Sequence, residues 1–118
     1  MSDKYYYLIE ERYDDWKETL NHCGLYLLKK SDDEIGYHIF EEFDIGVRIS
    51  CTDDMLTLLC ENGFIDDKMK MESMELRKLF CEIQIQESQL WNIESLRKHP
   101  RWKKIMELAD LIKSQIYV

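Results

Sequence analysis

Paired carboxylates are the residues of this sequence whose type and spacing most directly suggest a chemistry. They recur through the first 67 residues, at Glu10-Glu11, Asp14-Asp15, Asp32-Asp33-Glu34, Glu41-Glu42, Asp53-Asp54 and Asp66-Asp67. Such pairs can hold divalent cations, perform general acid–base catalysis or attract cationic proteins. The alternating acidic loop of an EF-hand is absent, and residues 31–34 and 65–68 lack a Gly and a bidentate Glu at loop spacing, so we expect no metal.

The charge of the chain is divided along its length. Residues 1–67 carry six Lys or Arg and seventeen Asp or Glu, a formal charge of −11, whereas residues 68–118 carry ten and seven, a formal +3; the two sums give −8. A field of this sign repels nucleic acid and attracts basic proteins. We therefore expect a protein partner and no nucleic-acid partner.

Histidine and cysteine chemistry has little support. The sequence contains no Gly-x-Ser-x-Gly elbow, no His-Glu-x-x-His, no Gly-rich phosphate loop and no Cys-x-x-Cys pair. A Cys51–His38 pair could form in space, but any chain with four Cys and three His allows such a guess. The cysteines lie beside apolar residues, which predicts buried, reduced thiols. We expect no enzyme and no cofactor.

Most of the chain has the pattern of helices. Apolar side chains at steps of three and four predict a helix over residues 3–23 that ends at Gly24, with a short strand over residues 5–9 and a helix from Asp14 as the alternative. Thr52 or Asp53 is a typical N-cap for a helix that ends before Gly63. A longer helix is expected from about residue 71 or 72, a break at residue 92 or 95, and a final helix from Pro100.

Residues 25–50 have a different pattern. Ile45, Val47 and Ile49 alternate with Gly46, Arg48 and Ser50, which is typical of a strand with one buried face. Acidic turns at residues 31–34 and 41–44 separate the apolar segments. The predicted fold is therefore α+β and predominantly helical, with four to five helices, a small antiparallel β-sheet or hairpin in residues 25–50, and one compact domain over residues 1–118.

The acidic turns are also the predicted contact surface. Carboxylates can simply solvate loops or cap helices, and that explanation suits Asp14-Asp15 and Asp53-Asp54. In residues 40–44, however, two phenylalanines flank the carboxylates, an arrangement that suits a hot spot for a basic protein. The predicted partner-binding residues are Asp32, Asp33, Glu34, Tyr37, Phe40, Glu41, Glu42, Phe43, Asp44, Asp53, Asp54, Asp66 and Asp67.

Two further clusters have both structural and functional interpretations. The basic stretch over residues 97–104 opposes the dipole of the helix that begins at Pro100, and we expect its side chains to form ion pairs with the acidic half. Its alternative is contact with an anionic partner or RNA. Met69, Met71 and Met74 are expected to fill the core, with an adaptable binding surface as the alternative.

Two segments resemble a known functional class. They are Gly36-Tyr-His-Ile-Phe-Glu-Glu-Phe-Asp-Ile-Gly-Val-Arg48 and Leu90-Trp-Asn-Ile-Glu-Ser-Leu-Arg-Lys-His-Pro-Arg-Trp-Lys-Lys-Ile-Met106. In them the chain is similar to the immunity proteins of bacterial toxin systems, particularly those paired with contact-dependent growth-inhibition toxins. That class has many unrelated folds and no shared motif, so the resemblance implies a mode of action and no residue roles. The mode is to bind one toxin, often a basic nuclease, and to cover its active site or substrate groove.

The function expected from the sequence is therefore that of a cytoplasmic inhibitor of a cognate basic toxin. No run of 18 apolar residues and no signal-peptide pattern is present, so we expect no membrane association. The alternative is a small regulatory or adaptor protein that acts as a homodimer or on a partner helix, through residues 116–118 or the methionine-rich turn.

Overall fold

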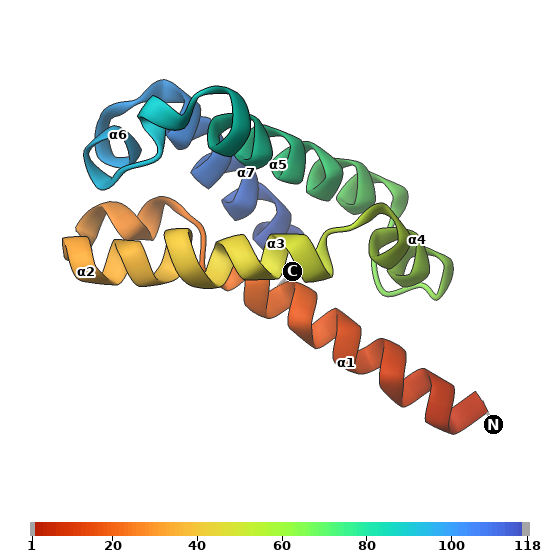
Figure 1. Cartoon of the computed structure of the whole chain (residues 1–118). Helices are drawn as coiled ribbons and strands as arrows, with labels where there is room; N and C mark the ends of the chain where they lie inside the picture. Colours follow the sequence, from red (N-terminus) through yellow and green to blue (C-terminus); the bar gives the residue numbers. More distant parts are fainter. Residues whose placement is uncertain (1, 117–118) are drawn as a thin grey trace.

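The computed structural model of the protein describes residues 2–116, with side chains from residue 7 onward, and these residues form helices and connecting loops (Figure 1). In chain order the elements are α1 (Ser2–Asn21), the 3₁₀ helix η1 (Leu25–Lys29), α2 (Asp32–Ile35), the π-helix η2 (Gly36–Phe43), α3 (Asp44–Ser50), α4 (Asp53–Glu61), α5 (Asp67–Gln86), the 3₁₀ helix η3 (Ser88–Leu90), α6 (Ile93–Lys98) and α7 (Pro100–Ile116).

The prediction of an α+β fold was wrong, because residues 25–50 contain no strand. The elements α2, η2 and α3 join end to end into one helical rod over residues 32–50, hereafter the 32–50 rod. Its junction residues Ile35 and Phe43 have helical φ/ψ values of −61°/−45° and −66°/−41°. Val47 faces the core, whereas Ile45 and Ile49 lie one helical turn apart on the outside.

The π-helical segment keeps the buried side of the 32–50 rod aligned. The buried residues Ile35, Ile39, Phe43 and Val47 follow one another at steps of four. In a regular α-helix with 3.6 residues per turn, each such step turns the stripe by about 40°. The wider turn of a π-helix reduces this drift, so the same face stays against the core.

An aromatic cluster forms the centre of the core. Phe80 of α5 is completely buried, and its ring centroid lies 4.9 Å from Phe43, 5.2 Å from Trp91 and 5.9 Å from Trp102. Phe40 closes the cluster, 4.9 Å from Trp91. The cluster thus joins the 32–50 rod to α5, α7 and the loop before α6, segments that are far apart in the sequence.

Three predicted helix ends are confirmed. The side chain of Thr52 accepts a hydrogen bond from the backbone N–H of Met55 at the start of α4. Gly63 follows the end of α4 with a φ of 79°, a left-handed conformation that favours glycine. Pro100 is the first residue of α7.

The start of α5 is earlier than predicted. Asp66 is its N-cap, since its Oδ1 accepts a hydrogen bond from the backbone N–H of Met69 over 2.8 Å. The helix therefore begins at Asp67, one turn before the expected residues 71–72. Met69 faces the core, whereas Met71 is exposed.

The end of α1 is tied to α7. The backbone N–H of Leu25 donates to Oδ2 of Asp110 over 3.0 Å, and Nζ of Lys113 donates to the carbonyl oxygen of Cys23 over 2.6 Å. No described helix is both long enough and apolar enough to cross a membrane.

Candidate protein-binding site

The carboxylates predicted to lie in turns belong to helices. Asp32, Asp33 and Glu34 form the first turn of α2, where the positive end of the helix dipole stabilises negative charge. Ser31 caps this turn, with its hydroxyl oxygen accepting from the N–H of Glu34 over 3.3 Å. Asp32 also pairs with Arg97 at 2.9 Å. This cluster therefore has a structural role at the helix start.

Two of the three predicted aromatic anchors face the interior. Phe43 is completely buried against Phe80, and Phe40 is half-buried against Trp91. Neither phenylalanine is placed to insert into a partner, because the helix directs both side chains toward the core. In the hairpin that the sequence predicted, one of the two would have been exposed. Tyr37 is the exposed member of the three, at 50%.

The remaining predicted carboxylates are dispersed over several elements. Asp44 pairs with Arg48 at 3.2 Å, and Asp53 pairs with Arg77 at 2.8 Å. Asp66 caps α5, and Asp67 accepts a hydrogen bond from Sγ of Cys60. The others are solvent-facing or partly exposed and form no ion pair among the described residues: Asp33, Glu34, Glu41, Glu42 and Asp54.

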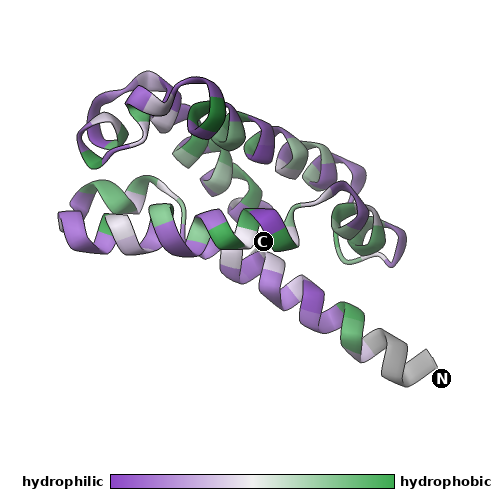
Figure 2. Cartoon of the chain, in the orientation of Figure 1, coloured by the Kyte–Doolittle hydropathy of each residue, from purple (hydrophilic) through white to green (hydrophobic). Residues whose placement is uncertain are grey.

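A shallow groove between α1 and the 32–50 rod collects carboxylates from both helices. It has a volume of about 280 Å³. Its lining residues are Asp15, Glu18, Thr19, His22, Glu42, Ile45, Gly46, Ile49 and Ser50. Figure 2 shows α1 coloured mainly as hydrophilic, and Glu10, Glu11 and Asp14 extend the acidic surface along this helix. We call the lining residues together with Tyr37 the acidic groove.

Gly46 allows the two helices of the groove to touch. A Cβ atom on Gly46 would lie 2.4 Å from Oγ1 and 2.7 Å from Cγ2 of Thr19, far inside van der Waals contact. Thr19 is held in this position because its Oγ1 donates to the carbonyl oxygen of Asp15 over 2.9 Å. The close approach brings the carboxylates of α1 next to those of the 32–50 rod.

Exposed apolar side chains lie among these carboxylates. Ile45 is 55% exposed and Ile49 is 57% exposed, on the outer side of α3. Tyr37 lies beside His22, with ring centroids 6.1 Å apart. A surface that mixes carboxylates with exposed apolar side chains suits a partner that is basic and also buries apolar area.

Internal ion pairs neutralise part of this negative charge: Asp15 of the acidic groove pairs with Arg12 at 3.1 Å and Asp14 pairs with Lys17 at 3.4 Å, whereas Glu42 forms no ion pair among the described residues. Of the basic stretch at residues 97–104, Arg97 pairs with the acidic half, whereas Arg101 pairs with Glu82 and Glu87 of the C-terminal half. Lys103 and Lys104 are exposed and make no ion pair within residues 7–116. Within the basic stretch, the predicted ion pairing with the acidic half is therefore found for Arg97 only.

A histidine pair closes one end of the groove. Nδ1 of His22 and Nδ1 of His38 are 2.8 Å apart, so one ring donates and the other accepts; Nε2 of His22 lies 3.3 Å from Glu18. Burial lowers the pKa of His38 and the neighbouring His22 lowers it further. Lys30 acts in the same direction, whereas the carboxylates of Glu34 and Glu42 act in the opposite one.

The lowered pKa of His38 predicts a loss of stability in weak acid. In the unfolded chain the side chain titrates at its ordinary value of 6.5, so below that pH the unfolded state binds the proton before the folded state does. The free energy of unfolding should therefore fall as the pH drops from 7 toward the lower folded pKa. His38→Gln should flatten this part of the curve in urea titrations at pH 7, 6 and 5; an equally steep fall would contradict the assignment.

The structure does not assemble a nucleophile or metal centre among the residues it describes. Cys51 has Arg77 and Cys81 as titratable neighbours, and burial raises its pKa to about 12, so the thiol stays protonated. The Cys51–His38 pair is therefore not formed, because His38 lies against His22. No described group of three His, Cys, Asp or Glu side chains could hold a metal ion.

Sequence reasoning missed the α1 side of the groove. From the sequence, Asp15 is expected at a helix start, and the expected contacts do not include Glu18, His22, Ile45 or Ile49. A signal was present, since Glu42, Ile45 and Ile49 follow helical spacing on one outward face. It would have required residues 32–50 to be interpreted as a helix.

Comparison of the chain with protein-family models, with curated proteins and with solved structures finds no match.

Proposed function

We propose that this chain is an immunity protein that binds a basic bacterial toxin through the acidic groove and neutralises it by covering its active site or substrate groove. The observation that supports the proposal is the juxtaposition of Asp15, Glu18 and Glu42 with the exposed Ile45 and Ile49. The expected toxin is a nuclease, because an enzyme that binds phosphates presents a cationic surface.

Electrostatics would govern how fast the complex forms. A chain of formal charge −8 with its carboxylates gathered on α1 and the 32–50 rod steers a cationic protein toward that side. Carboxylates that occupy the phosphate subsites of a nuclease would also exclude its substrate. Such steering raises the association rate and weakens as salt screens it.

Apolar contacts would govern how long the complex lasts. Ile45, Ile49 and Tyr37 are the exposed apolar or aromatic side chains of the acidic groove. Burying them under a partner removes apolar area from water, which slows dissociation. The two isoleucines thus replace Phe40 and Phe43 as the expected anchors.

Removing three carboxylates from the groove should slow association. We expect the variant Asp15→Asn/Glu18→Gln/Glu42→Gln to bind about tenfold more slowly at low salt and to lose most of its salt dependence, since these charges face the partner. The test protein is the toxin that the proposal requires, a basic C-terminal domain that we expect in the reading frame directly upstream of this chain. Association and dissociation rates are measured by surface plasmon resonance between low and physiological salt.

A charge-matched variant separates local contact from total charge. Asp54→Asn/Glu61→Gln/Glu107→Gln also removes three exposed carboxylates, all outside the groove and without ion pairs among the described residues. It should keep the association rate within about threefold of the unmodified chain. Equal effects of the two triple variants would remove the acidic groove from the proposal. Failure of the upstream domain to bind would contradict the immunity function itself.

A further inference from the structure

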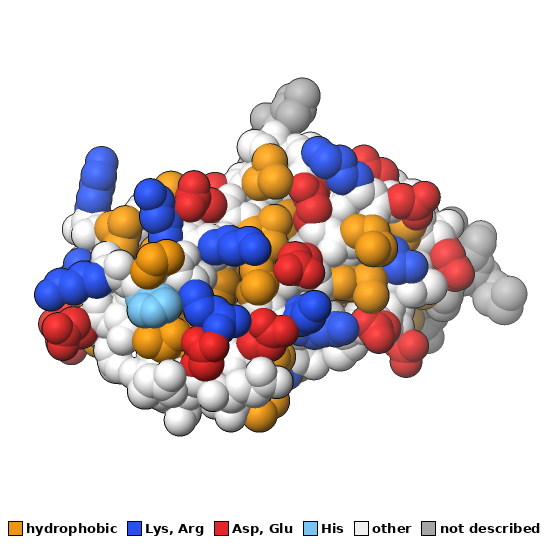
Figure 3. Space-filling view, turned by 90° about the horizontal axis from the view of Figure 1, so that it is seen from above, with side chains coloured by type: hydrophobic (Ala, Val, Ile, Leu, Met, Phe, Trp, Pro, Cys, Tyr) orange, Lys and Arg blue, Asp and Glu red, His pale blue; other side chains and the backbone are white. Residues whose placement is uncertain are grey.

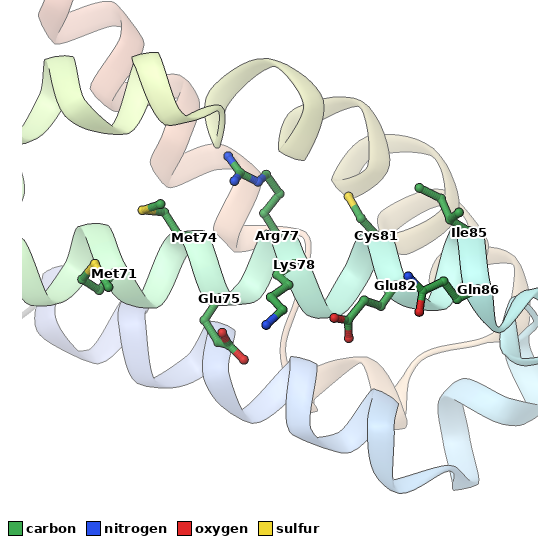
Figure 4. Close-up of a pocket in the computed structure, with 9 residues that line it drawn as sticks. All are labelled: Met71, Met74, Glu75, Arg77, Lys78, Cys81, Glu82, Ile85 and Gln86. Carbon is green, nitrogen blue, oxygen red and sulfur yellow. The ribbon is translucent and has the colours of Figure 1, made fainter.

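The outer face of α5 carries a mainly apolar stripe that is exposed at Met71 and Ile85, whereas Met74 and Cys81 are half-buried and Met74 packs against the core. The residues of the stripe follow one another at steps of 3, 4, 3 and 4: Met71, Met74, Lys78, Cys81 and Ile85 (Figure 4). Met71 is 62% exposed and Ile85 is 77% exposed. A shallow depression of about 470 Å³ runs along the stripe, and all of its lining residues belong to α5. In Figure 3, hydrophobic side chains on this side of the molecule lie between charged ones.

The core of one chain uses little of this stripe, since Met74 is its one member that packs against the described core cluster. The side of α5 that faces the core is a separate set of buried residues, Met69, Ser73, Leu76, Phe80 and Ile83. Steps that alternate between three and four average 3.5 residues, which is the repeat of a coiled-coil seam. The stripe therefore has the spacing of positions a and d in two heptads, on a helix that is already folded.

The two edges of the stripe carry opposite charges. Lys70 and Arg77 lie on one edge, and Glu75 and Glu82 lie on the other, seven residues apart in each case. Lys70 and Glu75 form no ion pair among the described residues, whereas Arg77 is paired with Asp53 and Glu82 with Arg101. The stripe is thus bordered by one basic and one acidic edge of equal charge.

This charge pattern selects both a partner and an orientation. In a parallel, in-register pair of identical helices, the basic edge of each meets the acidic edge of the other, so that Lys70 faces Glu75 and Arg77 faces Glu82. Reversing one helix would set acidic edge against acidic edge. Two copies of charge −8 repel over most of their surface, and this balanced face allows them to meet. We propose that α5 pairs in parallel with α5 of a second copy, forming a homodimer.

The expected dimer is weak and reversible. Lys78 occupies a seam position, where a polar residue lowers stability but favours a defined register. Two heptads bury less than the ~800 Å² per partner of a standard interface, so we expect micromolar dissociation constants. The acidic groove shares no residue with the stripe, and α1 lies on the opposite side of the molecule from it (Figure 1), so the dimer would leave both grooves open.

Charge reversal tests the parallel pairing. Lys70→Glu alone and Glu75→Lys alone each place like charges opposite one another at two symmetric positions, and should weaken the dimer about tenfold, equivalent to ~1.4 kcal/mol. The double variant restores opposite charges and should recover the original affinity. Sedimentation equilibrium over a concentration series measures all four proteins, and circular dichroism checks their folding. A chain that stays monomeric, or a double variant as weak as the singles, would overturn the proposal.

Cys81 supplies an independent test of register. A residue at position d faces its own copy in a parallel dimer, so two Cys81 thiols should come within disulfide reach. Diamide would take up the two electrons and two protons that the thiols lose, at mildly alkaline pH because burial raises the pKa of Cys81. In a Cys60→Ser background, we expect a covalent dimer that Cys81→Ser abolishes. Dimers that never cross-link would contradict parallel pairing.

Discussion

Replacing Phe80 by Ala should lower the free energy of unfolding by about 3–5 kcal/mol, the typical loss when a large buried aromatic side chain is truncated. Phe80 is completely buried and contacts Phe43, Trp91 and Trp102. Its removal leaves a cavity at the place where the 32–50 rod meets α5 and α7. Because the total stability of a domain is only ~5–15 kcal/mol, the variant should be close to unfolding at 37 °C.

Urea unfolding followed by circular dichroism measures this loss. Phe80→Leu keeps part of the side-chain volume and should lose less. Tyr37→Ala is the matched control, because it truncates an aromatic ring that is half exposed and lies outside the cluster, and it should change the stability by less than about 1 kcal/mol. A Phe80→Ala protein as stable as the Tyr37→Ala protein would show that the aromatic cluster does not hold the helices together.

Gly46→Ala and Gly36→Ala should change stability in opposite directions. Both glycines are helical, and alanine gains about 1 kcal/mol over glycine in a helix interior. At Gly36 nothing lies within 4 Å of the new Cβ, so Gly36→Ala should stabilise. At Gly46 the Cβ would overlap Thr19, and overpacking of ~1–3 kcal/mol should outweigh the gain.

A second substitution locates the cause of the Gly46→Ala loss. Thr19→Ala removes Oγ1 and Cγ2, the two atoms nearest to the new Cβ, so the loss from Gly46→Ala should be smaller in this background. Thermal unfolding of the four combinations gives the coupling between the two positions. Equal losses in both backgrounds would place the strain elsewhere than in the contact between α1 and α3.

Local sequence signals predicted three helix ends correctly, whereas α1 ends at Asn21, before the expected residue 23, and α5 begins at Asp67, before the expected residues 71–72. Thr52, Gly63 and Pro100 act through their own backbone or side-chain chemistry, which does not depend on distant residues. The apolar stripe predicted over residues 3–23 was likewise correct for Ile9, Trp16 and Leu20 of α1 and for Cys23 just beyond its end, all of which are buried. These features could be read from the sequence because their causes lie within one or two turns.

The 32–50 rod could not be read in the same way. Ile45, Val47 and Ile49 are β-branched and alternate with Gly46, Arg48 and Ser50, so local propensity favours a strand. Packing overrides that propensity, because only a helix buries Ile35, Ile39, Phe43 and Val47 together. Gly46, a poor helix former, is explained by a contact with Thr19 that lies 27 positions away in the sequence (46 − 19).

The same error affected the candidate site. Once residues 40–44 were treated as a turn, Phe40 and Phe43 became expected contacts, and Ile45 and Ile49 became expected core. The structure reverses both assignments, since Phe43 is buried and the two isoleucines are exposed. Net charge does not depend on the fold, so the expectation of a basic partner is unchanged by the correction and stays a proposal.

The hydrogen bonds that hold the segment after α1 to α6 and α7 affect when the protein can fold during its synthesis. The loop after α1 is held by Asp110 and Lys113, and residues 28–32 are held by Arg97, so each tie joins residues at least 65 positions apart. A ribosome releases the N-terminal half first, with its like charges unopposed and its anchors not yet translated. The nascent acidic half should therefore remain incompletely folded until residues 97–113 have left the ribosome.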